Sequence, residues 1–231
     1  MERTEINHLC DIMARLIPFP VYVMELDTGH ILYVSESHSG EFIGGYPASD
    51  AVDKGWRFLH EIISPETRPF IDDAINVIRD FYTKDLGTDK KHFTISFNCN
   101  ILTKNKALKV TVNHKFIPFI TDSDGKTTHI MGVFFPGNIA QKNTLVARNE
   151  NEGKRWIYEN GKWENAAYME LSDMEKIIMT YAIQGMSIKM IARNIGKSED
   201  TVKKYRKAIF TKLEVHNIAE AITIILTHKM L

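Results

Sequence analysis

Short runs of β-branched and aromatic residues, separated by polar turn residues, recur between residues 21 and 136 and predict β-strands. The first two runs are VYVMELD (21–27) and HILYVSES (30–37), and Thr28-Gly29 between them indicates a hairpin. Three later runs, KHFTISFNCNIL, ALKVTVNHKFIPFI and THIMGVFFP, are separated by Lys104-Asn105 and by an Asp-Ser-Asp-Gly turn at 122–125. The pattern therefore predicts two strands followed by three.

An amphipathic helix is predicted between these two groups of strands. In SPETRPFIDDAINVIRDFY the apolar residues recur every three to four positions, as a helix with one buried face requires. Ser64 is the expected N-cap, and Pro65 and Glu66 suit the first turn. Elements in this order predict an α+β fold for residues 1–137, with one antiparallel five-stranded sheet and helices.

The predicted order of elements resembles the PAS sensory family over roughly residues 10–137. Two further segments carry the likeness: IGGYPASD after the second strand, and FLHEIISPETRPFI before the long helix. The resemblance implies a domain that binds a small molecule, holds a cofactor or pairs with a copy of itself. The residues leave these alternatives open, and nothing in the sequence requires a cofactor.

Residues 138–168 are polar and are expected to form a linker that contains a β-hairpin. Asn160-Gly161 lies between Trp156-Ile157-Tyr158 and Trp163, and Asn-Gly suits a tight turn because both positions need positive φ. Two interpretations are open. The hairpin extends the sensory domain and packs its tryptophans on a neighbour, or it is a small surface hairpin with aromatic cross-strand pairs.

A helical module is predicted from residue 169 to the end of the chain. Three helices each begin after a serine that can cap them, namely Ser172, Ser187 and Ser198. Gly185 and Gly196 end the first two helices. The short glycine-containing turn between the second and third helices is the helix-turn-helix arrangement.

The third of these helices has two different faces. At 100° per residue, Val202, Ile209 and Leu213 fall on one side and form a core stripe. The opposite side is polar and basic, and Arg206 lies nearer the buried side, as a rim or structural arginine would. A helix that enters the major groove of DNA needs this division. The polar side comprises Asp200, Lys204, Lys207 and Thr211, with Lys203 on its flank.

Charge is distributed unevenly, although 29 Lys and Arg balance 29 Asp and Glu over the whole chain. Residues 1–148 hold 16 bases against 18 acids, whereas residues 172–231 hold ten against six. Five of those ten bases fall between positions 203 and 212. A basic end of this kind suggests a nucleic-acid-binding module, and the alternative is a helix face that is only solvated.

The helical module closely resembles the LuxR-type helix-turn-helix family of transcription regulators from Leu171 to about Ala221. The resemblance implies that the third helix reads DNA and that the fourth, in NIAEAITIILTHKM, supports dimer formation. The positions that carry the match have fixed spacing. They are Leu171-Ser172, Glu175, Gly185, Ser187, Lys189, Ile191-Ala192, Ile195, Ser198, Thr201-Val202-Lys203, Ile209, Lys212-Leu213, Val215, Asn217 and Glu220-Ala221.

The family resemblance and the position of residues on the polar side of the third helix together indicate candidate DNA contacts. Lys203, Lys204 and Lys207 are expected to contact DNA. Ser198 and Thr201, near the helix start, could donate to phosphate, although the main role of Ser198 is that of an N-cap. Lys189 and Arg193, on the outer side of the second helix, either contact the DNA backbone or are only solvated.

The match has four departures, at Ile177, Lys197, Tyr205 and Glu214. In the family an acid is usual at the first of these positions, an aliphatic residue at the second, His at the third and Gly at the fourth. None removes the scaffold, but Lys197 and Tyr205 would change the contact pattern and therefore the operator preference.

Other classes of protein fit the sequence less well. A phosphorylated receiver domain needs an acidic pair at a strand end, whereas Asp72-Asp73 falls inside the predicted helix. An acyl-homoserine-lactone receptor does not suit a domain that begins with two strands. No zinc-binding spacing, phosphate-binding glycine loop or nucleophile elbow is present, so we expect no enzyme. Isolated His60 and His92 are weak candidates for haem ligands.

Composition adds little to this picture. A 44% hydrophobic content is that of an ordinary globular protein, and no apolar run is long enough to span a membrane. The two cysteines, Cys10 and Cys99, are far apart, and Cys99 is expected to be a buried structural thiol. A cytoplasmic protein without membrane association is the default expectation.

The sequence therefore predicts a DNA-binding transcription regulator that is a homodimer on double-stranded DNA. RNA polymerase is a further candidate partner. The PAS-like domain would sense a signal or pair the subunits, and a signal would act through residues 138–168. The alternative is a protein-interaction adaptor that has lost DNA binding, and the basic residues at 203–207 favour the first function.

Overall fold

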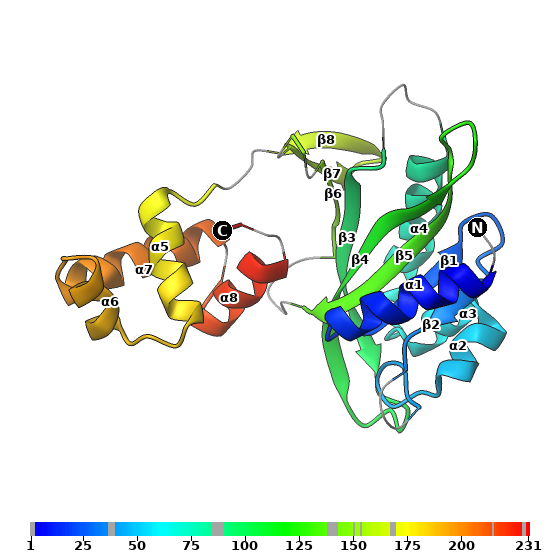
Figure 1. Ribbon diagram of the computed structural model, residues 1–231, viewed down its shortest axis with the longest axis horizontal. Coiled ribbons are helices and arrows are strands. Elements are labelled where there is room, and N and C mark those ends of the chain that lie inside the picture. The colour runs from blue at the N-terminus through cyan, green and yellow to red at the C-terminus, as the bar shows by residue number, and fades with distance from the viewer. Residues whose placement is uncertain are drawn as a thin grey trace. The chain divides into compact units, whose positions relative to one another are not determined.

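The computed structural model describes residues 3–36, 40–84, 90–137, 143–149, 151–152, 154–166, 170–213, 215–227 and 230–231 (Figure 1). The described residues separate into two compact units. The first unit holds those up to Gly137 and those from 143 to Ala166, and the second holds those from 170 onward.

An antiparallel sheet of eight strands forms the first unit (Figure 1). The strand order is β2-β1-β5-β4-β3-β6-β7-β8, so its first five strands follow the order 2-1-5-4-3. This confirms the predicted α+β, PAS-like arrangement, in which helices are inserted between β2 and β3. The predicted number of five strands is wrong, because β6, β7 and β8 join the same sheet through the pairing of β6 with β3. The strands are β1 Val21–Glu25, β2 Ile31–Val34, β3 Phe93–Leu102, β4 Lys109–Thr121, β5 Thr127–Pro136, β6 Leu145–Asn149, β7 Lys154–Glu159 and β8 Lys162–Ala166.

Helices cover both faces of this sheet. Side chains alternate between the two faces of a strand, so Tyr22 and Met24 of β1 lie in the main core while Val21 and Val23 lie in a second cluster. The main core includes residues of α2 (Ala48–Lys54), α3 (Trp56–Ile62) and α4 (Arg68–Thr83). The second cluster includes residues of α1 (Arg3–Leu16), which therefore covers the opposite face.

The long helix begins later than the sequence predicts. Ser64 is not its N-cap, because the Ser64 N–H donates to the carbonyl of Asn100 and so fixes this residue to β3. Its hydroxyl pairs with that of Thr67, 3.1 Å away. The helix starts at Arg68 with Pro69 in its first turn, and the apolar spacing that predicted it then buries Ile71 and Ile78.

Residues 143–166 differ most from the expectation of a linker. The hairpin is present, with Asn160 at φ 52° and Gly161 at φ 80°, but β6 pairs with β3 and β7 pairs with β6. The hairpin therefore extends the sheet of the first unit, which is the first of the two interpretations that the sequence leaves open. Trp163 packs on Phe81 of α4 at a ring distance of 5.3 Å, and Trp163 also pairs with Tyr158 across the strands at 5.2 Å.

The second unit is all-α, as predicted. Its four helices are α5 Asp173–Ile183, α6 Ile188–Asn194, α7 Glu199–Leu213 and α8 Ile218–Thr227 (Figure 1). Each contributes apolar side chains to one core, which includes Ile178, Ile191, Val202, Ile209 and Ile225. In neither unit does a described helix have the length and apolar character needed to cross a membrane.

Candidate nucleic-acid interface

The first helix of the second unit is fixed by a capping box. The Ser172 hydroxyl accepts a hydrogen bond from the Glu175 N–H, and the Glu175 carboxylate accepts one from the Ser172 N–H at 2.8 Å. Reciprocal bonds of this kind satisfy two backbone donors that a helix start would otherwise leave free. Glu175 is buried, so its carboxylate belongs to the scaffold and not to the exposed surface.

The next two helices are placed by caps and by glycines. Ser187 accepts from the Met190 N–H at 3.3 Å and Ser198 from the Thr201 N–H at 3.2 Å. Gly196, between α6 and α7, has φ 63°, a value that favours glycine and allows the chain to turn sharply. These caps support the predicted helix-turn-helix and fix the direction of α7.

The face of α7 that packs on the scaffold is the one that the sequence predicts. Val202 and Ile209 have no exposed surface and Leu213 is 4% exposed. Tyr205 is half-buried and packs against the same core. This attachment leaves the other side of α7 to the solvent.

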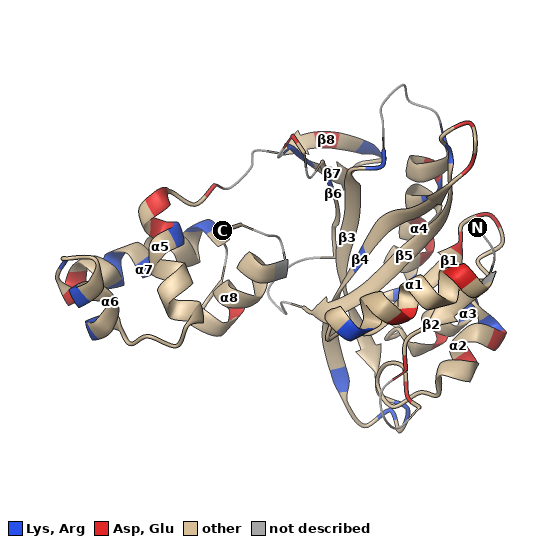
Figure 2. Cartoon of the chain, viewed as in Figure 1, with Lys and Arg blue, Asp and Glu red and all other residues tan. Residues whose placement is uncertain are grey.

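Lysines occupy the exposed side of α7. Lys203, Lys204 and Lys207 are all exposed, and Figure 2 shows Lys and Arg along α6 and α7. The Lys203 ammonium donates to Asp200 at 3.0 Å, and this hydrogen bond raises the pKa of Lys203. Within the described residues no acid lies within ion-pair distance of Lys204 or Lys207, so both ammonium groups are available to an anion.

Ser198 and Thr201 are engaged with each other at the start of α7. Their hydroxyl oxygens lie 2.9 Å apart, and Ser198 also caps the helix. One of the two hydroxyls must donate to the other, so only the second can donate a hydrogen bond to a phosphate. Ser198 is exposed and Thr201 is half-buried.

Lys189 and Arg193 lie four residues apart on α6 and are both exposed. Residues with this spacing share one helix face. With Ser198, Thr201 and the three lysines of α7, they complete the seven predicted contact residues. All seven lie in the second unit. Lys197, in the turn between the two helices, is a further exposed base.

Two of the five bases between positions 203 and 212 have other roles. The Lys212 ammonium donates to the Glu175 carboxylate at 2.7 Å, so it links the end of α7 to the start of α5. Arg206 is half-buried and its guanidinium lies 5.6 Å from the centre of the Phe210 ring. The number of bases in this segment does not separate Arg206 and Lys212 from the three exposed lysines. The difference depends on which side of the helix each base occupies.

Two of the four departures from the family pattern, Ile177 and Lys197, are exposed. Ile177 is 42% exposed on α5, where an acid would be solvated. Lys197 is exposed and Tyr205 is half-buried. Glu214 lies outside the described residues.

His60 and His92, the candidates for haem ligands, have separate surroundings. His60 pairs with Asp72 at 3.2 Å on the surface, and His92 is exposed before β3. The described residues contain no cluster of three or more His, Cys, Asp or Glu that could hold a metal ion. Cys99 is buried in β3, as expected, and burial raises the pKa of its thiol to about 12.

Comparison with known proteins identifies the second unit. Residues 169–225 match the family described as bacterial regulatory proteins, luxR family. The glycerol metabolism activator of Pseudomonas putida is 26% identical over 113 residues, 48% of this chain and 51% of that protein. The Fimbriae Z protein of Salmonella typhimurium is 36% identical over 63 residues, 27% of this chain and 30% of that protein. The chain thus spans about half or less of these relatives.

Solved structures give more distant likenesses. The VqmA dimer of Vibrio cholerae, described among LuxR-type receptors, aligns with 95% of this chain and 86% of its own, at 16% identity and a TM-score of 0.34. A variant of Vivid aligns with 52% of this chain and 77% of its own, at 16% identity and a TM-score of 0.38. The family match and the caps of α5, α6 and α7 agree: the second unit of this chain is a LuxR-type helix-turn-helix domain.

Proposed function

We propose that the chain is a DNA-binding transcription regulator, and that its first unit senses a small molecule or pairs the subunits. The observation that carries the proposal is the division of α7 into a buried side, with Val202 and Ile209, and an exposed side with Lys203, Lys204 and Lys207. The buried side fixes α7 to the domain, while the exposed side presents cations to phosphates and base edges.

The proposed complex is a homodimer on a pseudo-palindromic site. Two α7 helices would then enter the major groove about one helical turn apart. The fourth helix supports this arrangement, because Leu226 of α8 is 56% exposed although it is apolar. A Leu226→Glu variant is expected to be monomeric by light scattering and to bind DNA more weakly. A variant that stays dimeric would place the dimer contact elsewhere.

A signal from the first unit would reach DNA through the segment that leads to the second unit. Strands β6 to β8 form one edge of the sheet and directly precede this segment in the sequence. Trp163 of β8 contacts Phe81 of α4. A regulator of this kind acts in the cytoplasm, where RNA polymerase would be a second partner.

A salt titration of DNA binding tests the proposal. The full chain is titrated with a pool of genomic DNA fragments at several salt concentrations, without any added small molecule. Each lysine–phosphate contact contributes about 0.9 to the slope of log affinity against log salt. The variant Lys203→Ala/Lys204→Ala/Lys207→Ala should therefore bind more weakly, with a slope reduced by about three.

A matched control removes the same charge from the first unit. Lys104→Ala/Lys106→Ala/Lys162→Ala also loses three exposed lysines, and it should bind DNA like the wild type. If the wild type shows no salt-dependent binding, the proposal fails and a protein-interaction adaptor becomes the better function. An equal effect of both triple variants would mean that only net charge matters and that α7 has no special role.

A further inference from the structure

A small cavity lies inside the first unit, between the sheet and the helices. Its volume is about 160 Å³. Apolar side chains from three strands and from α4 form most of its wall, including Met24, Phe116, Ile130 and Ile78. An engineered cavity of about 150 Å³ with apolar walls holds benzene, so this space suits a molecule with about one ring.

Two hydrogen-bond donors in the cavity wall have no acceptor among the residues that the structure describes. Trp56 and Arg79 both line the cavity, and the Trp56 Nε1 and Arg79 Nε atoms are buried without a hydrogen-bond partner. A buried donor that lacks a partner destabilises the folded state. Both groups can only donate, so a molecule in the cavity that satisfies them must offer an acceptor.

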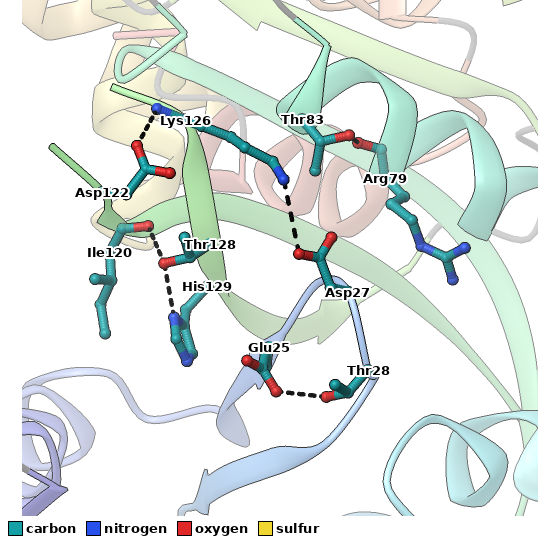
Figure 3. A network of polar contacts seen from close by, with 10 residues as sticks. All are labelled: Glu25, Asp27, Thr28, Arg79, Thr83, Ile120, Asp122, Lys126, Thr128 and His129. Atoms are coloured by element: carbon teal, nitrogen blue, oxygen red, sulfur yellow. Dashed lines mark hydrogen bonds and ion pairs between the residues drawn. The ribbon is translucent and has the colours of Figure 1, made fainter. Parts of the chain in front are cut away.

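Arg79 also lacks a counter-charge among the described residues. Figure 3 shows Arg79 in a network of polar contacts, where the contact drawn to it is the hydrogen bond from the Thr83 hydroxyl to its main-chain carbonyl and none is drawn to its guanidinium. Two acids in the same region are already engaged: Asp27 pairs with Lys126 at 3.6 Å, and Glu25 accepts a hydrogen bond from Thr28. The guanidinium is always charged at neutral pH, so the acceptor that fits it best is an anion.

Trp56 is held in place by the turn that follows β1. The main-chain N–H of Trp56 donates a hydrogen bond to the Gly29 carbonyl at 3.0 Å, and the neighbouring Gly55 has φ 57°. A Cβ at Gly55 would come within 2.5 Å of the Gly29 oxygen, so only glycine allows this approach. The backbone that carries the indole donor is therefore fixed by the protein itself.

We propose that this cavity binds a small organic carboxylate on a compact apolar body, with Arg79 and Trp56 as its recognition residues. The proposal deepens the sensing role proposed for the first unit and rests on it. Arginine and carboxylate form charge-assisted hydrogen bonds, which are stronger than those between neutral groups. The apolar wall would bury the rest of the molecule.

Calorimetric titration of the full chain, without DNA, tests this proposal. The probes are benzoate, phenylacetate and 4-methylpentanoate, each compared with its primary amide, which has nearly the same shape but no charge. At least one carboxylate should bind, about tenfold or more tightly than its amide, because only the anion neutralises Arg79. If no carboxylate binds, or if the amides bind equally well, the proposal is overturned.

Three variants locate the binding. Arg79→Met should weaken carboxylate binding about tenfold or more, and Trp56→Phe, which keeps a ring but loses the N–H, should weaken it severalfold. Arg57→Met removes an exposed arginine outside this cavity and should have no effect. Unchanged binding in Arg79→Met would overturn the proposal.

A stability measurement separates recognition from a structural role of Arg79. Without a probe, Arg79→Met should unfold at the same temperature as the wild type or higher, because it removes a donor that has no partner. A clearly lower unfolding temperature would assign Arg79 to the fold and overturn the proposal. Since the DNA titration uses no probe and this one uses no DNA, each proposal can fail without the other.

Discussion

The Lys212 ammonium donates a hydrogen bond to the Glu175 carboxylate across 2.7 Å and so joins the end of α7 to the start of α5. The same carboxylate accepts bonds from the N–H and the hydroxyl of Ser172, at 2.8 and 3.0 Å. One buried acid therefore completes the capping box and also holds the helix that carries the proposed DNA contacts.

Replacing Lys212 by Met should destabilise the second unit. Glu175 would remain buried without its cation, which is costly in low dielectric. We expect a loss of about 1–2 kcal/mol in urea unfolding, less than for a fully buried pair because the Lys212 side chain is 40% exposed. Lys207→Met, which removes an exposed lysine from the same helix, is the control and should cost less than about 0.5 kcal/mol. Equal losses in the two variants would contradict this role of Lys212.

Stability should also depend on pH through Glu175. Burial raises the pKa of this carboxyl, but the hydrogen bonds from Lys212 and Ser172 outweigh burial and leave the pKa below its ordinary value of 4.5. Because the folded pKa is lowered, the stabilisation is fully present above the unfolded pKa and is lost as pH falls through the folded value. Urea unfolding between neutral pH and about pH 3 should show this loss. In Glu175→Gln the acid-dependent part should be smaller; an identical pH profile would refute the assignment.

The elements that the sequence predicts well are those whose signals are local. Ser187 and Ser198 cap their helices as predicted, because a cap involves only the next three residues. Ser64 fails as a cap because its N–H bonds to Asn100 on a strand that lies far along the chain. Strand β6 is missed for the same reason: LVARN gives a weak local signal, and its pairing with β3 is a long-range contact.

Gly132 should not tolerate a side chain. It pairs with Tyr22 across β1 and β5, and a Cβ at this position would lie 2.4 Å from the Tyr22 ring. That ring is fully buried, and its hydroxyl lies 2.9 Å from Nε2 of His114, so it cannot move freely. Gly132→Ala should cost about 2 kcal/mol or more in thermal or urea unfolding.

A double-mutant cycle provides the control for Gly132. In a Tyr22→Leu background the ring is absent, so the added methyl group should cost much less than in the wild type. If the cost is the same in both backgrounds, the clash with Tyr22 is not its cause.

Neutralising Asp200 should strengthen DNA binding. Asp200 holds the Lys203 ammonium at 3.0 Å on the exposed side of α7, and its negative charge would face the phosphates. Asp200→Asn should raise affinity severalfold at moderate salt and make the salt slope steeper, as fluorescence anisotropy can measure. Asp50→Asn in the first unit is the control. A loss of affinity would indicate that the Asp200 carboxylate accepts a hydrogen bond from a base.

The candidate site could be predicted only in part. The side of a helix on which a residue lies follows from the helical period. The buried Val202 and the exposed Lys204 are therefore as the sequence predicts. The cavity could not be found this way, because Trp56 and Arg79 come from separate helices and neither has an unusual sequence context. Their significance depends on unpartnered buried atoms, which appear only once the chain is folded.

Trp163 should couple the cavity to DNA binding. Its ring packs on Phe81 of α4, the helix that also contributes Ile78 and Arg79 to the cavity wall. A ligand that shifts α4 would therefore move β8, the last described strand before the second unit. In Trp163→Ala, carboxylate binding and salt-dependent DNA binding should both persist, while the effect of the carboxylate on DNA affinity should be lost. Lys162→Ala, on the same strand but exposed, should keep that effect. A full ligand response in Trp163→Ala would show that the signal takes another route.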